Sequence, residues 1–172
     1  MFKWFSGLNG GQRASDRQDP APVVNKRDRI LEAVIAHQHI GLLFQPQIDP
    51  ASGEIVGVEA LARWDGAASP QELFERAAAS GLAERLSRLV QRKALRAAAT
   101  WEGALKPLHL SINLLPQDLA RPGYDQWLLD EIECAGIDPR RLTVEITESA
   151  LLSDSDSIAE RLARLRSAGI RV

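Results

Sequence analysis

Apolar residues recur at two different spacings along this chain, and the change of spacing marks the expected elements. Residues 29–39 repeat apolar positions every three or four residues behind Asn25 or Asp28 as a cap, which predicts a helix. Residues 41–49 and 54–64 have the character of strands, and only the tetrapeptide PASG separates them. A parallel crossover needs about a dozen residues or more, so the sequence predicts that these two strands are antiparallel. The apolar face of the first helix is expected to contain Ile30, Leu31, Val34 and Ile35.

Two further helices are expected after the strand pair. The segment SPQELFERAAASG offers Ser69 as cap, Pro70 at the first helical position, Glu72 as the reciprocal capping acid and Gly81 as the end. Residues 82–103 predict a second, longer helix. Its apolar face is expected to contain Leu82, Leu86, Leu89, Val90 and Trp101.

Strands and helices alternate in the rest of the chain. The pattern predicts strands at 107–115, 142–149 and 170–172, with helices at 124–136 and 155–169 between them. A strand and helix unit that repeats in this way indicates a parallel sheet with right-handed crossovers. The expected fold class is therefore α/β.

The strands carry polar side chains on one face. Because side chains alternate along a strand, Glu59, Leu61 and Arg63 lie on one face of their strand. Asn113 and Glu145 lie on the polar faces of the next two predicted strands. If the strands are neighbours in a barrel, Glu59, Asn113 and Glu145 project toward one end of its interior. Two carboxylates and an amide oxygen suit Mg²⁺ or Mn²⁺, and Arg63 nearby suits a phosphate. The alternative is that these residues are isolated polar groups, satisfied by buried hydrogen bonds or exposed at strand ends.

Composition and charge narrow the function classes. The 172 residues are 45% hydrophobic and 26% charged, which is enough to bury a core. A formal net charge of -2, without a basic block, argues against a nucleic-acid polymer as partner. The single cysteine, Cys134, cannot form an internal disulfide, which favours a reducing cytoplasmic setting. No stretch reaches the length of a transmembrane segment.

Two segments are expected to carry no function of their own. Residues 1–25 mix Gly, Ser, Gln, Asp and Pro without a period, which is typical of a flexible leader ahead of a domain at 26–172.

Arginines recur at helical spacing within the longest predicted helix, and we expect them to form a solvated outer face. These arginines are Arg85, Arg88, Arg92 and Arg96.

Four motifs in order carry a resemblance to a known family. Glu59, Ala60 and Leu61 spell EAL within VEALARW, the motif FQPQID precedes them, and LSINLL and VEITES follow. Together these motifs resemble the EAL family of cyclic di-GMP phosphodiesterases, from about Lys26 to Val172. The resemblance implies an incomplete TIM-like (β/α) barrel of the EAL type with its first strand antiparallel, which agrees with the short PASG connection.

The resemblance also implies a role for particular residues. Glu59, Asn113 and Glu145 match the metal ligands of the family, which would bind Mg²⁺ or Mn²⁺. Glu148 matches the acid that holds an active-site loop, and with Glu59 it completes the catalytic pair. The positions that contact the dinucleotide are Gln45, Leu61 and Arg63. The implied reaction is hydrolysis of cyclic di-GMP to the linear dinucleotide pGpG, with a pair of divalent ions that activate a water molecule.

The resemblance covers about half of such a barrel. The family continues the strand at 170–172 into a DDFG motif, and later strands supply a lysine, a glutamate and a glutamine; the sequence contains none of these after Val172. We therefore expect that this chain alone does not hydrolyse cyclic di-GMP. Its incomplete metal site would bind an ion weakly, and the unpaired edge at 170–172 would favour a homodimer or a complementing EAL half. A non-catalytic cyclic di-GMP-binding or protein-interaction module and a truncated gene product remain the alternatives.

Overall fold

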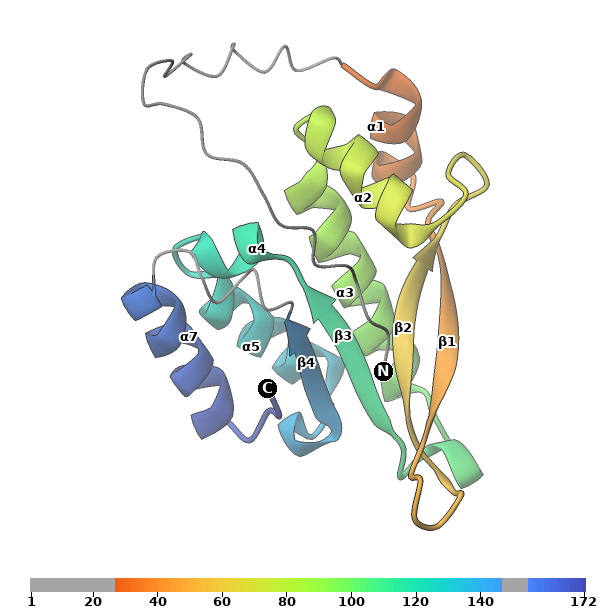
Figure 1. Cartoon of the computed structure of the whole chain (residues 1–172), viewed down its shortest axis with the longest axis vertical. Coiled ribbons are helices and arrows are strands. Elements are labelled where there is room, and N and C mark those ends of the chain that lie inside the picture. Colours follow the sequence, from red (N-terminus) through yellow and green to blue (C-terminus); the bar gives the residue numbers. More distant parts are fainter. Residues whose placement is uncertain (1–26, 147–154) are drawn as a thin grey trace, which may run out of the picture.

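A computed structural model describes residues 27–146 and 155–172 of the chain. The leader expected at 1–25 and the predicted site residue Glu148 lie outside the described residues. Figure 1 shows the described part as a curved sheet with helices packed along it.

Four strands form the sheet, in the order β1-β2-β3-β4. They are β1 (Gly41–Ile48), β2 (Ile55–Arg63), β3 (His109–Leu114) and β4 (Leu142–Ile146). β1 and β2 pair antiparallel, as the short PASG connection predicted, and β2, β3 and β4 pair parallel. The observed sheet therefore confirms an α/β arrangement with the first strand reversed.

The strand predicted at 170–172 is present only as an isolated β-bridge at Arg171. The backbone N–H of Arg171 donates to the carbonyl of Leu142 at 3.0 Å, and the N–H of Val144 donates to the carbonyl of Arg171 at 2.8 Å. These two bonds form a parallel bridge between Thr143 and Arg171, so the segment adds to the β4 side of the sheet.

The described residues also form six α-helices and two short 3₁₀ turns. The α-helices are α1 (Arg29–Ala36), α2 (Pro70–Ala79), α3 (Ala83–Ala99), α4 (Pro116–Ala120), α5 (Tyr124–Ala135) and α7 (Ser155–Ser167). The 3₁₀ turns are η1 (Gly103–Leu105) and η2 (Pro139–Arg141). None of the described helices is both long and apolar enough to cross a membrane.

The ends of α2 follow from local chemistry. The Ser69 hydroxyl accepts the Glu72 backbone N–H at 3.1 Å, which caps the first turn as expected. The Glu72 carboxylate reaches one residue further back than a standard capping box, and it accepts the Ala68 N–H at 2.7 Å. At the other end, Gly81 takes a positive φ of 70°, which glycine adopts without steric cost.

Two expectations for helix faces need correction. α1 stops at Ala36, and Ile30 on that helix is 65% exposed rather than part of its buried face. Trp101 lies beyond the end of α3, where its ring packs edge-on against Phe44 of β1. Trp101 falls outside because α3 ends at Ala99, whereas Ile30 lies within α1, whose buried face contains Leu31 and Ile35 instead.

The core forms where the apolar face of the sheet meets the helices. Leu110, Ile112 and Val144 of the sheet cluster with side chains of α3, α5 and α7. A second cluster joins α1, α2 and the N-terminal half of α3, with Leu73 and Leu86 fully buried in it. Packing on one face leaves the other face of the sheet for the polar residues.

Two arginines of α3 do not form the solvated outer face that their spacing indicated. The Arg92 guanidinium donates to both carboxylate oxygens of Glu131 on α5, with its Nε at 2.9 Å from each. The Arg88 guanidinium lies 4.8 Å from the ring centroid of Trp127, also on α5. These contacts hold α3 against α5, because a long side chain can pack along its stem while its charge is paired.

Candidate functional site

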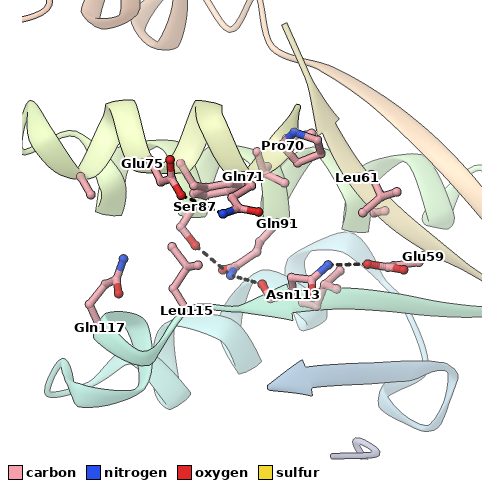
Figure 2. Close-up of a pocket in the computed structure, with 16 residues that line it drawn as sticks. Glu59, Leu61, Pro70, Gln71, Glu75, Ser87, Gln91, Asn113, Leu115 and Gln117 are labelled. Carbon is pink, nitrogen blue, oxygen red and sulfur yellow. Dashed lines mark hydrogen bonds between the residues drawn. The ribbon is translucent and has the colours of Figure 1, made fainter. Parts of the chain in front are cut away.

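Two of the three predicted ligands meet on the polar face of the sheet. Glu59 of β2 and Asn113 of β3 face the same side, because side chains alternate along each strand. The Asn113 side-chain amide donates to a Glu59 carboxylate oxygen at 2.7 Å (Figure 2). The amide oxygen of Asn113 remains as an acceptor or ligand beside the carboxylate.

The third predicted ligand, Glu145, makes a different contact. It is the register partner of Asn113 in the parallel pair of β3 and β4. Its carboxylate accepts a hydrogen bond from the side-chain amide of Gln47 on β1 at 2.9 Å. The carbonyl oxygen of that amide accepts the Ser111 hydroxyl at 3.0 Å. The sequence reasoning missed Gln47, although counting in twos from Gln45 places it on the same face.

The donor set has the right chemistry for a hard divalent cation. Glu59, Asn113 and Glu145 supply carboxylate and amide oxygens from three neighbouring strands, which is the ligand type of Mg²⁺ and Mn²⁺. Within the described residues, no group of three or more acidic, histidine or cysteine side chains is gathered closely enough to hold an ion. Of the three predicted ligands, Asn113 and Glu59 are joined by a hydrogen bond, whereas Glu145 is hydrogen-bonded to Gln47.

The residues expected to contact a dinucleotide are placed unequally. Gln45 lies beside Glu59 in the register of β1 and β2, and it is exposed. Leu61 lines the cavity next to Glu59 (Figure 2). The Arg63 guanidinium donates to the backbone carbonyl of Ala62 at 2.9 Å, so it points along its own strand in this structure.

A cavity of about 540 Å³ opens between the ends of β2 and β3 and the helices α2 and α3. Glu59 and Asn113 form one side of it, and Phe74 and Val90 contribute apolar walls. A second, more polar hollow of about 580 Å³ lies along the same face of the sheet, where Gln47, Ser111 and Glu145 form part of its lining. The arrangement offers an apolar surface beside carboxylate and amide oxygens, which suits a ligand with a flat apolar part whose anionic group is bridged to the carboxylates by a divalent cation.

A buried hydrogen-bond network supports the Asn113 end of β3, and the sequence alone did not indicate it. The Gln91 amide of α3 donates to the Ser87 hydroxyl at 3.0 Å and to the backbone carbonyl of Asn113 at 3.3 Å (Figure 2). The Tyr124 hydroxyl donates to the Gln91 carbonyl oxygen at 2.8 Å. Ser87 donates to the Asp118 carboxylate at 2.5 Å. The network connects α3, α4, α5 and β3 through groups that are almost fully buried.

Burial sets the ionisation of two groups in this network. It raises the pKa of the Asp118 carboxyl, although hydrogen bonds from Ser87 and the Leu115 backbone N–H oppose the shift. Burial also raises the pKa of the Tyr124 hydroxyl well above its ordinary value, and the nearby Asp118 charge adds to this effect. Tyr124 therefore stays protonated and acts as a donor.

Comparison with known proteins agrees with this geometry. The EAL domain model matches residues 27–172. The chain is 34% identical over 143 residues to the "Probable cyclic di-GMP phosphodiesterase PdeB" of Escherichia coli, and 32% identical over 145 residues to a cyclic di-GMP phosphodiesterase of Pseudomonas aeruginosa. These alignments cover 81% and 82% of this chain, and the chain spans 28% and 25% of the length of the two relatives.

Two solved structures with similar folds agree with this family match. The c-di-GMP complex of the PaMucR phosphodiesterase matches with a TM-score of 0.74 at 25% identity, over 81% of this chain and 59% of that one. The manganese/cy-diGMP complex of Klebsiella pneumoniae BlrP1 matches with a TM-score of 0.64 at 30% identity, over 76% of this chain and 33% of that one. These neighbours are TIM-like barrels, and the four described strands of this chain form an incomplete one. The family match extends over most of the sequence, and the chain therefore belongs to the EAL domain family.

Proposed function

We propose that residues 27–172 supply one part of a metal-dependent cyclic di-GMP phosphodiesterase site. The contact between the Asn113 amide and the Glu59 carboxylate carries the proposal, because it joins two of the expected ligands on adjacent parallel strands. The names of the relatives support the substrate, and the manganese complex of BlrP1 supports the need for a cation.

Each candidate residue has a distinct task in this proposal. Glu59, Asn113 and Glu145 would hold Mg²⁺ or Mn²⁺, and a bound cation would activate a water molecule and neutralise charge on the phosphate, so that cyclic di-GMP yields pGpG. Leu61, which lines the cavity beside Glu59, and the exposed Gln45 would contact the dinucleotide. Arg63 would have to leave the Ala62 carbonyl to pair with a phosphate.

Glu148 takes part in the proposal through the family resemblance alone. It would hold an active-site loop in place, while Glu59 serves the chemical step directly. A cytoplasmic location is part of the same proposal, because the relatives act on a nucleotide and the single cysteine fits a reducing compartment.

We further propose that a polypeptide of these 172 residues binds cyclic di-GMP with a cation but does not hydrolyse it by itself. The described sheet stays open beyond β4, with only the Arg171 bridge beside it, and Glu145 is held by Gln47 rather than by the Glu59 and Asn113 pair. Turnover would then require a homodimer or a complementing EAL half that completes the barrel. A non-catalytic binding or protein-interaction module is the second candidate, and a truncated gene product is the third.

Binding and turnover measured on the same sample separate these candidates. Calorimetry of the purified chain with cyclic di-GMP is expected to show binding that depends on Mn²⁺, and Glu59→Gln is expected to weaken it by at least about tenfold. Glu133→Gln, on the exposed face of α5, is the matched control. Chromatography of the reaction mixture is expected to detect no pGpG.

The results narrow the candidates. Absence of cyclic di-GMP binding in the parent chain would leave the protein-interaction module and the truncated gene product. Binding that Glu59→Gln does not change would exclude the proposed cation site. Formation of pGpG by the 172-residue chain would show that the open sheet already contains the groups that hydrolysis needs.

A further inference from the structure

We propose that Gln47 is a positioning residue that orients the Glu145 carboxylate for a divalent cation. The inference rests on the proposed function, and it assigns a task to a side chain that lies within FQPQID but to which the resemblance gave no role. Gln47 lies on β1 and Glu145 on β4, at opposite edges of the four described strands. Its amide reaches across the polar face because the sheet is curved (Figure 1).

The hydrogen bonds fix which way the amide points. The Ser111 hydroxyl donates to its carbonyl oxygen at 3.0 Å, and its nitrogen donates to Glu145 Oε1 at 2.9 Å. Ser111 is only 1% exposed, so its hydroxyl has a defined partner rather than bulk water. Among the hydrogen bonds of the described residues, the second Glu145 oxygen, Oε2, receives none and stays available to a cation.

A glycine provides the space for this contact. Gly57 is the register partner of Gln47, and a Cβ atom built on Gly57 would lie 3.1 Å from the Gln47 amide oxygen. The same Cβ would lie 2.9 Å from the carbonyl oxygen of His109, closer than Cβ atoms normally approach. Any larger residue at this position would push the amide away from Ser111 or separate β2 from β3.

The expected consequence is an effect on metal affinity. A hydrogen-bond donor to a ligating carboxylate fixes its orientation before the ion arrives, and loss of such a donor typically weakens metal binding by about 10- to 100-fold. Gln47 itself need not touch the ion. Its task is to keep the Glu145 carboxylate in one orientation near its register neighbour Asn113.

The test is Mn²⁺ binding by the full 172-residue chain, measured by calorimetry and by the electron paramagnetic resonance signal of free Mn²⁺. Gln47→Met keeps the length of the side chain and removes the donor, and the Kd for Mn²⁺ is expected to rise about 10- to 100-fold. The matched control is Gln126→Met, because Gln126 also donates to a carboxylate, that of Asp130, at 2.8 Å on the exposed surface of α5. The control is expected to keep the parent Kd within about twofold.

A second variant and a second measurement distinguish an effect on metal binding from an effect on folding. Ser111→Ala removes the group that orients the Gln47 amide, and it is expected to raise the Kd by a smaller factor. In the parent chain, the side-chain amide resonance of Gln47 is expected to shift when Mg²⁺ is added, while that of Gln126 stays in place. A role confined to folding would change the melting temperature and leave the Gln47 resonance insensitive to the cation.

The outcomes separate this inference from the proposed function. If Gln47→Met and Ser111→Ala both bind Mn²⁺ like the parent, the role of Gln47 is refuted and the cation site stands. If the parent chain does not bind Mn²⁺, the cation site itself is refuted, and the inference that depends on it is refuted too.

Discussion

Replacing Gln91 with leucine tests the buried network behind the candidate site. Gln91 is 1% exposed, and its amide is the acceptor for the Tyr124 hydroxyl and a donor to Ser87 and to the Asn113 carbonyl. Leucine preserves most of the volume, but it leaves the buried Tyr124 donor without a partner. An unpaired buried donor costs about 1–3 kcal/mol, and the long 3.3 Å bond to Asn113 adds less, so we expect a loss of about 2 kcal/mol of unfolding free energy.

A double-mutant cycle isolates the hydrogen bond between Gln91 and Tyr124. Tyr124→Phe removes the hydroxyl that Gln91→Leu leaves without a partner. The double variant is therefore expected to lose about 1–2 kcal/mol less unfolding free energy than the sum of the losses in the two single variants. The assay is urea unfolding followed by circular dichroism, with unchanged denaturant slopes as the test of a common reference state. Gln126→Leu on the exposed face of α5 is expected to change stability by less than about 0.5 kcal/mol. Strictly additive costs in the double variant would refute the network as the source of the loss.

Three further predictions concern pH, an ion pair and a cap. Burial raises the pKa of Asp118, so protonation of this carboxyl stabilises the fold below its ordinary pKa of 3.8, and the stabilisation is lost as the pH rises through the raised pKa. Asp118→Asn does not titrate, so its stability relative to the parent should increase between pH 3 and pH 7 in urea titrations. A difference that stays constant with pH would contradict this. The hydrogen bond from Arg92 lowers the pKa of Glu131, so Glu131→Gln should cost about 1 kcal/mol of unfolding free energy at pH 7. This cost should decrease below the ordinary pKa of 4.5 and disappear as the pH falls through the lowered pKa, because Glu131 is then protonated as well. A cost that persists in acid would show that it arises from packing. Ser69→Ala should cost about 1 kcal/mol by thermal unfolding, because the Glu72 N–H loses its acceptor. The control is Ser167→Ala on the exposed side of α7, whose hydroxyl donates to the Ala163 carbonyl and caps no backbone N–H; equal effects of the two changes would argue against a specific cap.

The sequence predicted which face of the sheet the candidate residues share better than it predicted their contacts. Period-two counting placed Glu59 and Asn113 on one face, and the parallel order of the strands made them neighbours. Glu145 was also placed on the polar face, but its hydrogen-bond partner was not predicted, because the contact with Gln47 joins residues 98 positions apart. The prediction that the α3 arginines form a solvated face was wrong for Arg92 for a similar reason. Helical spacing gives the direction in which Arg92 points, but it does not show that Glu131 of α5 lies opposite.

The amino-acid sequence by itself determined the element types, the reversal of β1 and the polar face of the sheet. These properties are local: a four-residue connection excludes a crossover, and alternation along a strand decides which side chains share a face. Tertiary structure alone decided that Gln47 reaches Glu145 and that Gln91 joins Tyr124 to the Asn113 strand. Such contacts depend on how far the sheet curves and how close the helices pack, and these distances arise from the whole core rather than from any one segment.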